Sequence, residues 1–192
     1  IKFHPKGYQP TKMFRRLTGA WRDIDLKGNE ANQRVEAFSV LPENAKVVVF
    51  EPHLHAAGVR MCLDAIYGTE VETLNCVGYN HGWVRAYTYT NDSAPLLPKG
   101  TILRLTGYFD NTAANKNVPD PRNWSGMGHR SVDQMFFDLG GGVYLSDDEY
   151  QQEIAKRRER LRLAEGQTVV GCPGCAYRKV EPPTPAARVG ND

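Results

Sequence analysis

Two histidines separated by a single residue are the part of this sequence best suited to chemistry. His53 and His55 follow the apolar run Val47–Phe50, which is typical of a buried strand. Pro52 has no backbone N–H, so the strand is expected to kink or to lie at a sheet edge there. In extended backbone both imidazoles lie on one face, with Cα atoms about 6.5–7 Å apart, and Leu54 points to the other. Two neutral imidazoles at that distance can share one metal ion, although the spacing also fits two solvent-facing histidines that bind nothing.

The strands expected to position this pair begin at Arg34. Short runs rich in alternating or β-branched residues are separated by turn signals, with no helical period between them. These runs are 34–40, 45–50, 59–67, 71–77, 83–90, 101–109 and 132–139, and Gly140–Gly142 is expected to end the β region. The loop 110–130 is long enough to predict a functional role. The pattern predicts an all-β, antiparallel two-sheet sandwich over 34–145, preceded by an irregular segment, 1–33.

Two cysteines lie on the arms of an expected hairpin within this β region. A three-residue loop at Gly68–Glu70 would place Cys62 directly opposite Cys76. Opposed Cβ atoms approach to about 4.5–5.5 Å, so a disulfide needs only a modest adjustment. A disulfide indicates an oxidising compartment, periplasmic or extracellular. The alternative is a pair of reduced, buried cysteines that act as small apolar residues.

Residues 146–192 have a different character. Ser146–Glu149 reads as a capping box, which predicts a helix that runs to about Glu165 and stops at Gly166. Acidic residues lead and basic residues follow, which complements the helix dipole. The apolar stripe is too thin for deep burial, and the tail from Pro182 is rich in proline. We therefore expect an arm that binds other protein subunits, with packing back onto the sandwich as the alternative.

A second cysteine pair, Cys172 and Cys175, forms a CxxC motif in this region. Ala176 follows it, where a haem attachment motif needs histidine. A structural zinc site needs four ligands, and a thioredoxin-like role needs a βαβ setting; neither is present nearby. Two interpretations of the CxxC motif remain: a local disulfide, or half of a metal site that a partner completes.

Composition excludes some classes of protein. A chain of 192 residues with 41% apolar content can bury one substantial core. The net charge of +2 gives no argument for binding nucleic acid. No apolar run is long enough to predict a transmembrane helix. The first residues, Ile1–Pro5, resemble neither a start methionine nor a signal peptide, so we expect a processed or truncated piece.

Five segments are arranged in an order typical of one protein family. They are Leu41–Lys46 leading into Pro52–Gly58, Leu97–Thr101, Phe109–Thr112, and Gly128–Met135. Together they resemble the C-terminal domain of the copper type II, ascorbate-dependent monooxygenases, such as peptidylglycine alpha-hydroxylating monooxygenase and dopamine beta-monooxygenase, and their bacterial relatives. The resemblance covers roughly residues 34–140 and implies a jelly-roll-like sandwich.

The resemblance also implies a copper site. His53 and His55 match the two imidazole ligands of the family's oxygen-binding copper, and Met135 matches its thioether ligand. Two imidazoles and a soft thioether favour copper, particularly Cu(I), over magnesium, calcium or manganese. For Met135 the alternative is a methionine that fills a gap in the core. His81 and His129 could complete a further site or be ordinary loop residues.

Two departures from the family bear on activity. Gln134 stands where the family's stretch has glutamate, and Lys2 stands where a ligand histidine of the second, electron-transfer domain is expected. Monooxygenation takes two electrons, and one copper ion delivers one, so turnover within this chain alone is not expected. The chain is then either a monooxygenase-like copper domain that works with a missing domain, or a non-catalytic accessory subunit of a larger, membrane-associated or soluble, complex.

Two other metal folds fit less well. A cupin also places an HxH motif in a β-barrel, but it needs a glutamate shortly after the pair and a further histidine. Here Val59 and Arg60 follow. A cupredoxin needs a clustered Cys-His-Met loop, which neither Cys62 nor Cys76 provides.

Overall fold

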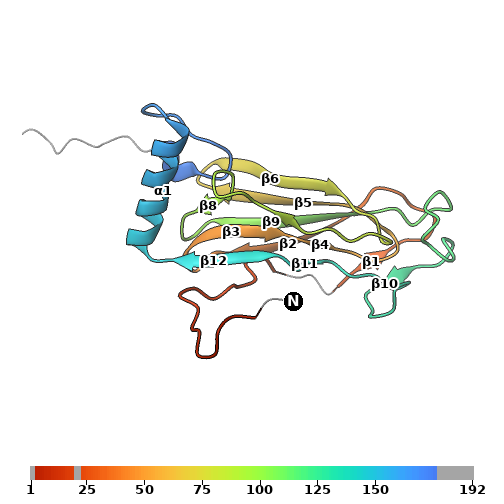
Figure 1. Cartoon of the computed structure of the whole chain (residues 1–192). Coiled ribbons are helices and arrows are strands. Elements are labelled where there is room, and N and C mark those ends of the chain that lie inside the picture. The colour runs from red at the N-terminus through yellow and green to blue at the C-terminus, as the bar shows by residue number, and fades with distance from the viewer. Residues whose placement is uncertain (1–2, 20–22, 177–192) are drawn as a thin grey trace, which may run out of the picture.

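Two antiparallel sheets form the framework of the computed structural model, which describes residues 3–19 and 23–176 (Figure 1). The larger sheet has the spatial order β2 (Gln33–Val40), β9 (Ile102–Phe109), β5 (Gly58–Tyr67) and β6 (Glu70–Gly78). The second has the order β12 (Gly141–Leu145), β3 (Asn44–Phe50) and β7 (Tyr87–Thr88), and β8 (Leu96–Leu97) also pairs with β3. Two short ribbons complete the β structure: β4 (Pro52–His53) with β11 (Phe137–Asp138), and β1 (Asp25–Leu26) with β10 (Ser125–Gly126).

The core lies between the two main sheets. From the larger sheet, Met61, Leu63 and Ala65 of β5 point inward at alternate positions, and none is exposed. From the second sheet, Ala45 and Val47 of β3 join the same cluster, again at alternate positions. This two-residue period is what a strand with one buried face requires. The prediction of an all-β, antiparallel sandwich is confirmed.

The hairpin of β5 and β6 joins the cysteines, although not through the loop that we predicted. The turn has two residues, because Tyr67 pairs with Glu70, so the expected three-residue loop is wrong. A β-bulge then shifts the register by one residue, so that Cys62 pairs with Cys76. The extra residue at the shift, Leu74, is buried in the core. The predicted disulfide between Cys62 and Cys76 is confirmed.

The glycine triplet at 140–142 does not end the β region, as the sequence suggested, but opens strand β12. Gly142 lies so close to β3 that an added Cβ would stand 1.9 Å from the carbonyl oxygen of Lys46. On its other side Gly142 exchanges backbone hydrogen bonds with Arg15 of the N-terminal segment. Glycine is needed at this position because the Lys46 backbone approaches it closely. The strands expected over 83–90 and 132–139 are also shorter than predicted, since only β7 and β11 form ladders.

Helix α1 (Asp147–Leu161) begins as predicted and ends earlier. The backbone N–H of Glu149 donates to the Ser146 hydroxyl at 3.3 Å, and the Glu149 carboxylate accepts from the Ser146 N–H at 2.8 Å. These two bonds form the expected capping box. The helix ends at Leu161 because Arg162 takes a left-handed conformation, with φ of 52°. Gly166, the predicted stop, has a positive φ in the turn that follows.

Helix α1 and the CxxC segment pack against one end of the sandwich, which is the alternative that the sequence left open for this region (Figure 1). Tyr150 and Ile154 form a second apolar cluster with Leu96, Leu145 and the two cysteines of the CxxC segment. Cys172 and Cys175 form a local disulfide, as predicted, at the 3₁₀ turn η1 (Pro173–Ala176). The proline-rich part of the expected arm, from Pro182 onward, lies outside the described residues.

No helix within the described ranges is both long enough and apolar enough to cross a membrane.

Candidate metal centre

The HxH motif lies at the end of strand β4. As the spacing predicted, the two histidine side chains lie on one face and Leu54 lies on the other. In strand β4, His53 is paired with Phe137 of β11, and the two rings stack with centroids 4.9 Å apart. Leu54 is fully buried in the core. His55 is 7% exposed. The centroids of the His53 and His55 rings are 5.2 Å apart, so both imidazoles lie together on the side opposite Leu54.

A tight turn after the motif fixes the backbone of His55. The N–H of Gly58 donates to the His55 carbonyl at 2.8 Å, which closes the turn. An added Cβ at Gly58 would lie 2.3 Å from the Cβ of Leu54, so this position requires glycine. The hydroxyl of Tyr79 donates to the Leu54 carbonyl at 3.1 Å. The backbone on both sides of His55 is therefore fixed, by the turn at Gly58 and by the hydrogen bond from Tyr79 to Leu54.

The buried amide of Gln134 also holds this loop. Gln134 is 2% exposed; its side-chain oxygen accepts the Ala57 N–H at 3.3 Å, and its amide donates to the Ser125 hydroxyl at 3.0 Å. An amide side chain can serve both partners because it carries a donor and an acceptor. From the sequence, Gln134 is notable only because it stands where the copper monooxygenases that the chain resembles have a glutamate. In the structure this residue joins the histidine loop to the loop after β9.

A third imidazole, that of His81, lies beside the pair. The ring centroids of His55 and His81 are 5.8 Å apart. His81 follows strand β6 in a turn where the Asn80 side chain accepts the Gly82 N–H at 2.9 Å. The sequence offered both His81 and His129 as additions to the site. The structure brings His81 to it, whereas His129 is exposed in the loop before Asp133 and makes no ring contact with the other three among the described residues.

The three imidazoles have unsatisfied polar atoms. The Nδ1 atoms of His53, His55 and His81 are buried, and none has a hydrogen-bond partner among the described residues. Burial lowers the pKa of His53, and the neighbouring His55 and His81 rings lower it further. Burial also lowers the pKa of His55, against an opposing effect of the Arg130 backbone. Neutral imidazole is the form that binds metals, so this environment favours ligation.

The lowered pKa values predict a pH dependence for the stability of the metal-free protein. Above pH 6.5 both histidines are neutral in the folded and the unfolded chain, and the free energy of unfolding is unaffected. As the pH falls below that, the unfolded chain takes up protons first, so the free energy of unfolding should decrease. We expect this decrease in urea unfolding curves between pH 7 and pH 5.

A double variant isolates the contribution of the pair. In His53→Gln/His55→Gln the decrease between pH 7 and pH 5 should be smaller than in the wild type. Burial raises the pKa of Asp138, which by itself makes the free energy of unfolding increase as the pH falls. This contribution is the same in the wild type and the double variant, so it cancels when their pH dependences are compared. Equal slopes in the double variant and the wild type would contradict the account.

Met135 precedes the short ribbon that contains His53. Strand β11 begins at Phe137, which pairs with His53, and Met135 lies two residues before it. Side chains alternate along a strand, so Met135 shares the face of Phe137, which stacks on His53. Phe136, on the other face, is fully buried in the core. The alternation of buried and half-buried residues from 134 to 138 therefore puts the half-buried Met135 on the face of Phe137, the ring that stacks on His53.

As placed in the structure, no three His, Cys, Asp or Glu side chains within residues 3–19 and 23–176 already surround a common point at which they could hold a metal ion. A set of two imidazoles and a thioether contains only two side chains of these four types. The unpaired nitrogens and the soft sulfur fit Cu(I) better than they fit a hard ion.

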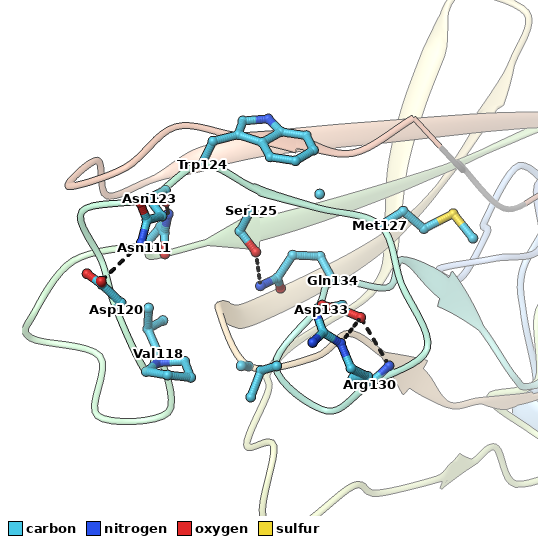
Figure 2. Close-up of a pocket in the computed structure, with 14 residues that line it drawn as sticks. Asn111, Val118, Asp120, Asn123, Trp124, Ser125, Met127, Arg130, Asp133 and Gln134 are labelled. Atoms are coloured by element: carbon cyan, nitrogen blue, oxygen red, sulfur yellow. Dashed lines mark hydrogen bonds and ion pairs between the residues drawn. The ribbon is translucent and has the colours of Figure 1, made fainter.

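A cavity of about 490 Å³ lies next to the centre, enclosed largely by the loop after β9 (Figure 2). Figure 2 shows Gln134 and Ser125 pointing toward each other between the Trp124 ring and an ion pair of Arg130 with Asp133. The ion pair measures 2.7 Å, and hydrogen bonding to Arg130 is the main reason why the pKa of Asp133 is lowered. The cavity borders the histidine loop at Ala56 and is also lined by Gln134.

No protein-family model matches the chain, and no curated protein is significantly similar to it. A functional assignment therefore rests on the geometry and chemistry of this centre.

Proposed function

We propose that this chain binds one copper ion, as Cu(I), through His53, His55 and Met135. The observation that carries the proposal is the pair of buried, unpaired Nδ1 atoms on adjacent imidazoles. Buried polar atoms in folded proteins nearly always have partners, and leaving one unpaired costs about 1–3 kcal/mol. A metal ion on these nitrogens removes that cost.

The surroundings of the centre suit a soft metal ion. The Phe137 ring stacked on His53 and the core beneath Leu54 make the site apolar on two sides. Burial keeps the imidazoles neutral, so they are ready to bind without first losing a proton. Copper held by two imidazoles and a thioether supplies an open position for dioxygen or another small donor.

We also propose that the protein works outside the cytosol and together with a partner. Two disulfides favour an oxidising compartment, so we propose a periplasmic or extracellular location. One copper site delivers one electron, so any oxygenation would require a second redox centre on another domain or subunit. The exposed aromatic residues Phe3, Tyr8 and Phe14, together with the region 146–192, are candidate surfaces for such partners, in a monooxygenase or in a non-catalytic complex.

The test is a Cu(I) titration of the purified full chain under anaerobic conditions against a chromophoric chelator. We expect one Cu(I) per chain, bound far more tightly than micromolar. Binding no tighter than that of a denatured sample would contradict the proposal.

A further inference from the structure

His81 is a half-buried histidine that the proposed Cu(I) site does not use. Its segment is hydrogen-bonded to Leu54, within the histidine motif, and to the start of β5. The backbone N–H of Tyr79 donates to the Val59 carbonyl at 2.8 Å, and the Tyr79 hydroxyl donates to the Leu54 carbonyl at 3.1 Å. Two residues later, the His81 ring lies against that of His55, with its Nδ1 buried and unpaired. This anchoring gives the His81 ring a defined place beside that of His55.

The separations of the His55 ring from those of His53 and His81 are close to those of ligands around one ion. With metal–nitrogen bonds of about 2.0–2.1 Å, two imidazoles on a tetrahedral ion have ring centroids about 5 Å apart. The observed centroid separations are 5.2 Å for His53 and His55, and 5.8 Å for His55 and His81. The described side chains do not yet surround a common point, so the rings must turn about their side-chain bonds to bind. The separations require no movement of the strands.

We propose that His81 is the third protein ligand when the centre holds a divalent ion, so that His53, His55 and His81 bind Zn²⁺ or Cu²⁺ with an open fourth position. Imidazoles suit these ions, whereas a thioether selects Cu(I). Three imidazoles plus a water are an established ligand set for zinc. The inference rests on the proposed function because both place a metal ion on His53 and His55. It does not require that this ion is Cu(I).

The experiment measures Zn²⁺ and, separately, anaerobic Cu(I) affinity by chelator competition on the full chain. The proteins are the wild type, His81→Ala, His81→Gln and the control His129→Ala, whose histidine is exposed. Losing even an outer partner of a ligand weakens metal binding about 10–100-fold, so losing a direct ligand should weaken Zn²⁺ binding about 100-fold or more. Cu(I) affinity should change less than about threefold, and the control should match the wild type in both.

Circular dichroism and urea unfolding of each metal-free variant establish that it is folded before its affinity is interpreted. Zn²⁺ binding by a folded His81→Ala or His81→Gln protein that equals the wild type would overturn the inference, as would a wild type that binds no Zn²⁺. The outcome is separable from that of the proposed function. A wild type that binds Zn²⁺ through His81 but not Cu(I) would overturn the copper proposal and support the third ligand.

Discussion

Replacing His53 or His55 by alanine is expected to weaken Cu(I) binding by about 100-fold or more, which is the loss that removal of a direct ligand implies. Each substitution removes one of two adjacent imidazoles whose buried Nδ1 atoms have no other partner within the described residues. Because those atoms contribute no hydrogen bond to the apo fold, alanine should leave the metal-free protein folded. The measurement is anaerobic chelator competition, with urea unfolding of each apo variant as the test of folding.

The matched control for these variants is His129→Ala. His129 is an exposed histidine of the neighbouring loop and makes no ring contact with the pair within the described part of the chain. It should bind Cu(I) as the wild type does. If His53→Ala and His129→Ala bind Cu(I) equally well, the copper ion is held elsewhere and the assigned centre is wrong.

The second large effect concerns the helix at the end of the sandwich. Ile154→Ala is expected to lower the free energy of unfolding by about 2–5 kcal/mol, the range for truncating a buried isoleucine. Ile154 is 5% exposed and packs with Leu96 and Leu145 of the sandwich and with the CxxC disulfide. An added Cβ at Gly174 would lie 2.4 Å from the Cδ1 of Ile154, so the CxxC segment is pressed closely onto this side chain.

An exposed position of the same helix supplies the comparison. Glu159→Ala removes a solvent-facing side chain and should change the free energy of unfolding by less than about 0.5 kcal/mol. Urea unfolding of both variants measures the difference. A similar small effect for Ile154→Ala would mean that helix α1 stands away from the sandwich, as an arm would, and that the packing described above is wrong.

Local patterns predicted the parts of the fold that depend on local rules. Alternating apolar residues identified the long strands β2, β5 and β9, and the capping box at Ser146 identified the start of helix α1. Features that depend on distant backbone contacts were missed. The glycines of β12 read as a stop, because the closely approaching backbones of Lys46 and Arg15 are remote in sequence.

Two further errors have the same origin. The pairing of Cys62 with Cys76 was predicted with the wrong loop length, since the bulge at Leu74 supplies the register shift and has no local signal. The packing of helix α1 was underestimated because its few apolar residues, Tyr150 and Ile154, find their partners far along the chain. A thin apolar stripe is sufficient where a disulfide covers it.

The candidate centre was predictable in part. The spacing of His53, Leu54 and His55 fixed which side chains share a face, and burial of Leu54 in the core agrees with it. The neighbourhood of His81 depends on the turn after β6 and on the Tyr79 anchor, which no spacing rule specifies. The role of Gln134 likewise follows only from the fold, because its partners belong to two separate loops.

X-ray absorption spectroscopy at the copper edge of the Cu(I)-loaded protein tests the central claim most directly. The account predicts two nitrogen scatterers from His53 and His55 and one sulfur scatterer from Met135, with the sulfur lost in Met135→Leu. Both disulfides leave no free cysteine in the described residues to supply a thiolate. A spectrum without sulfur, or one whose sulfur signal persists in Met135→Leu, would contradict it.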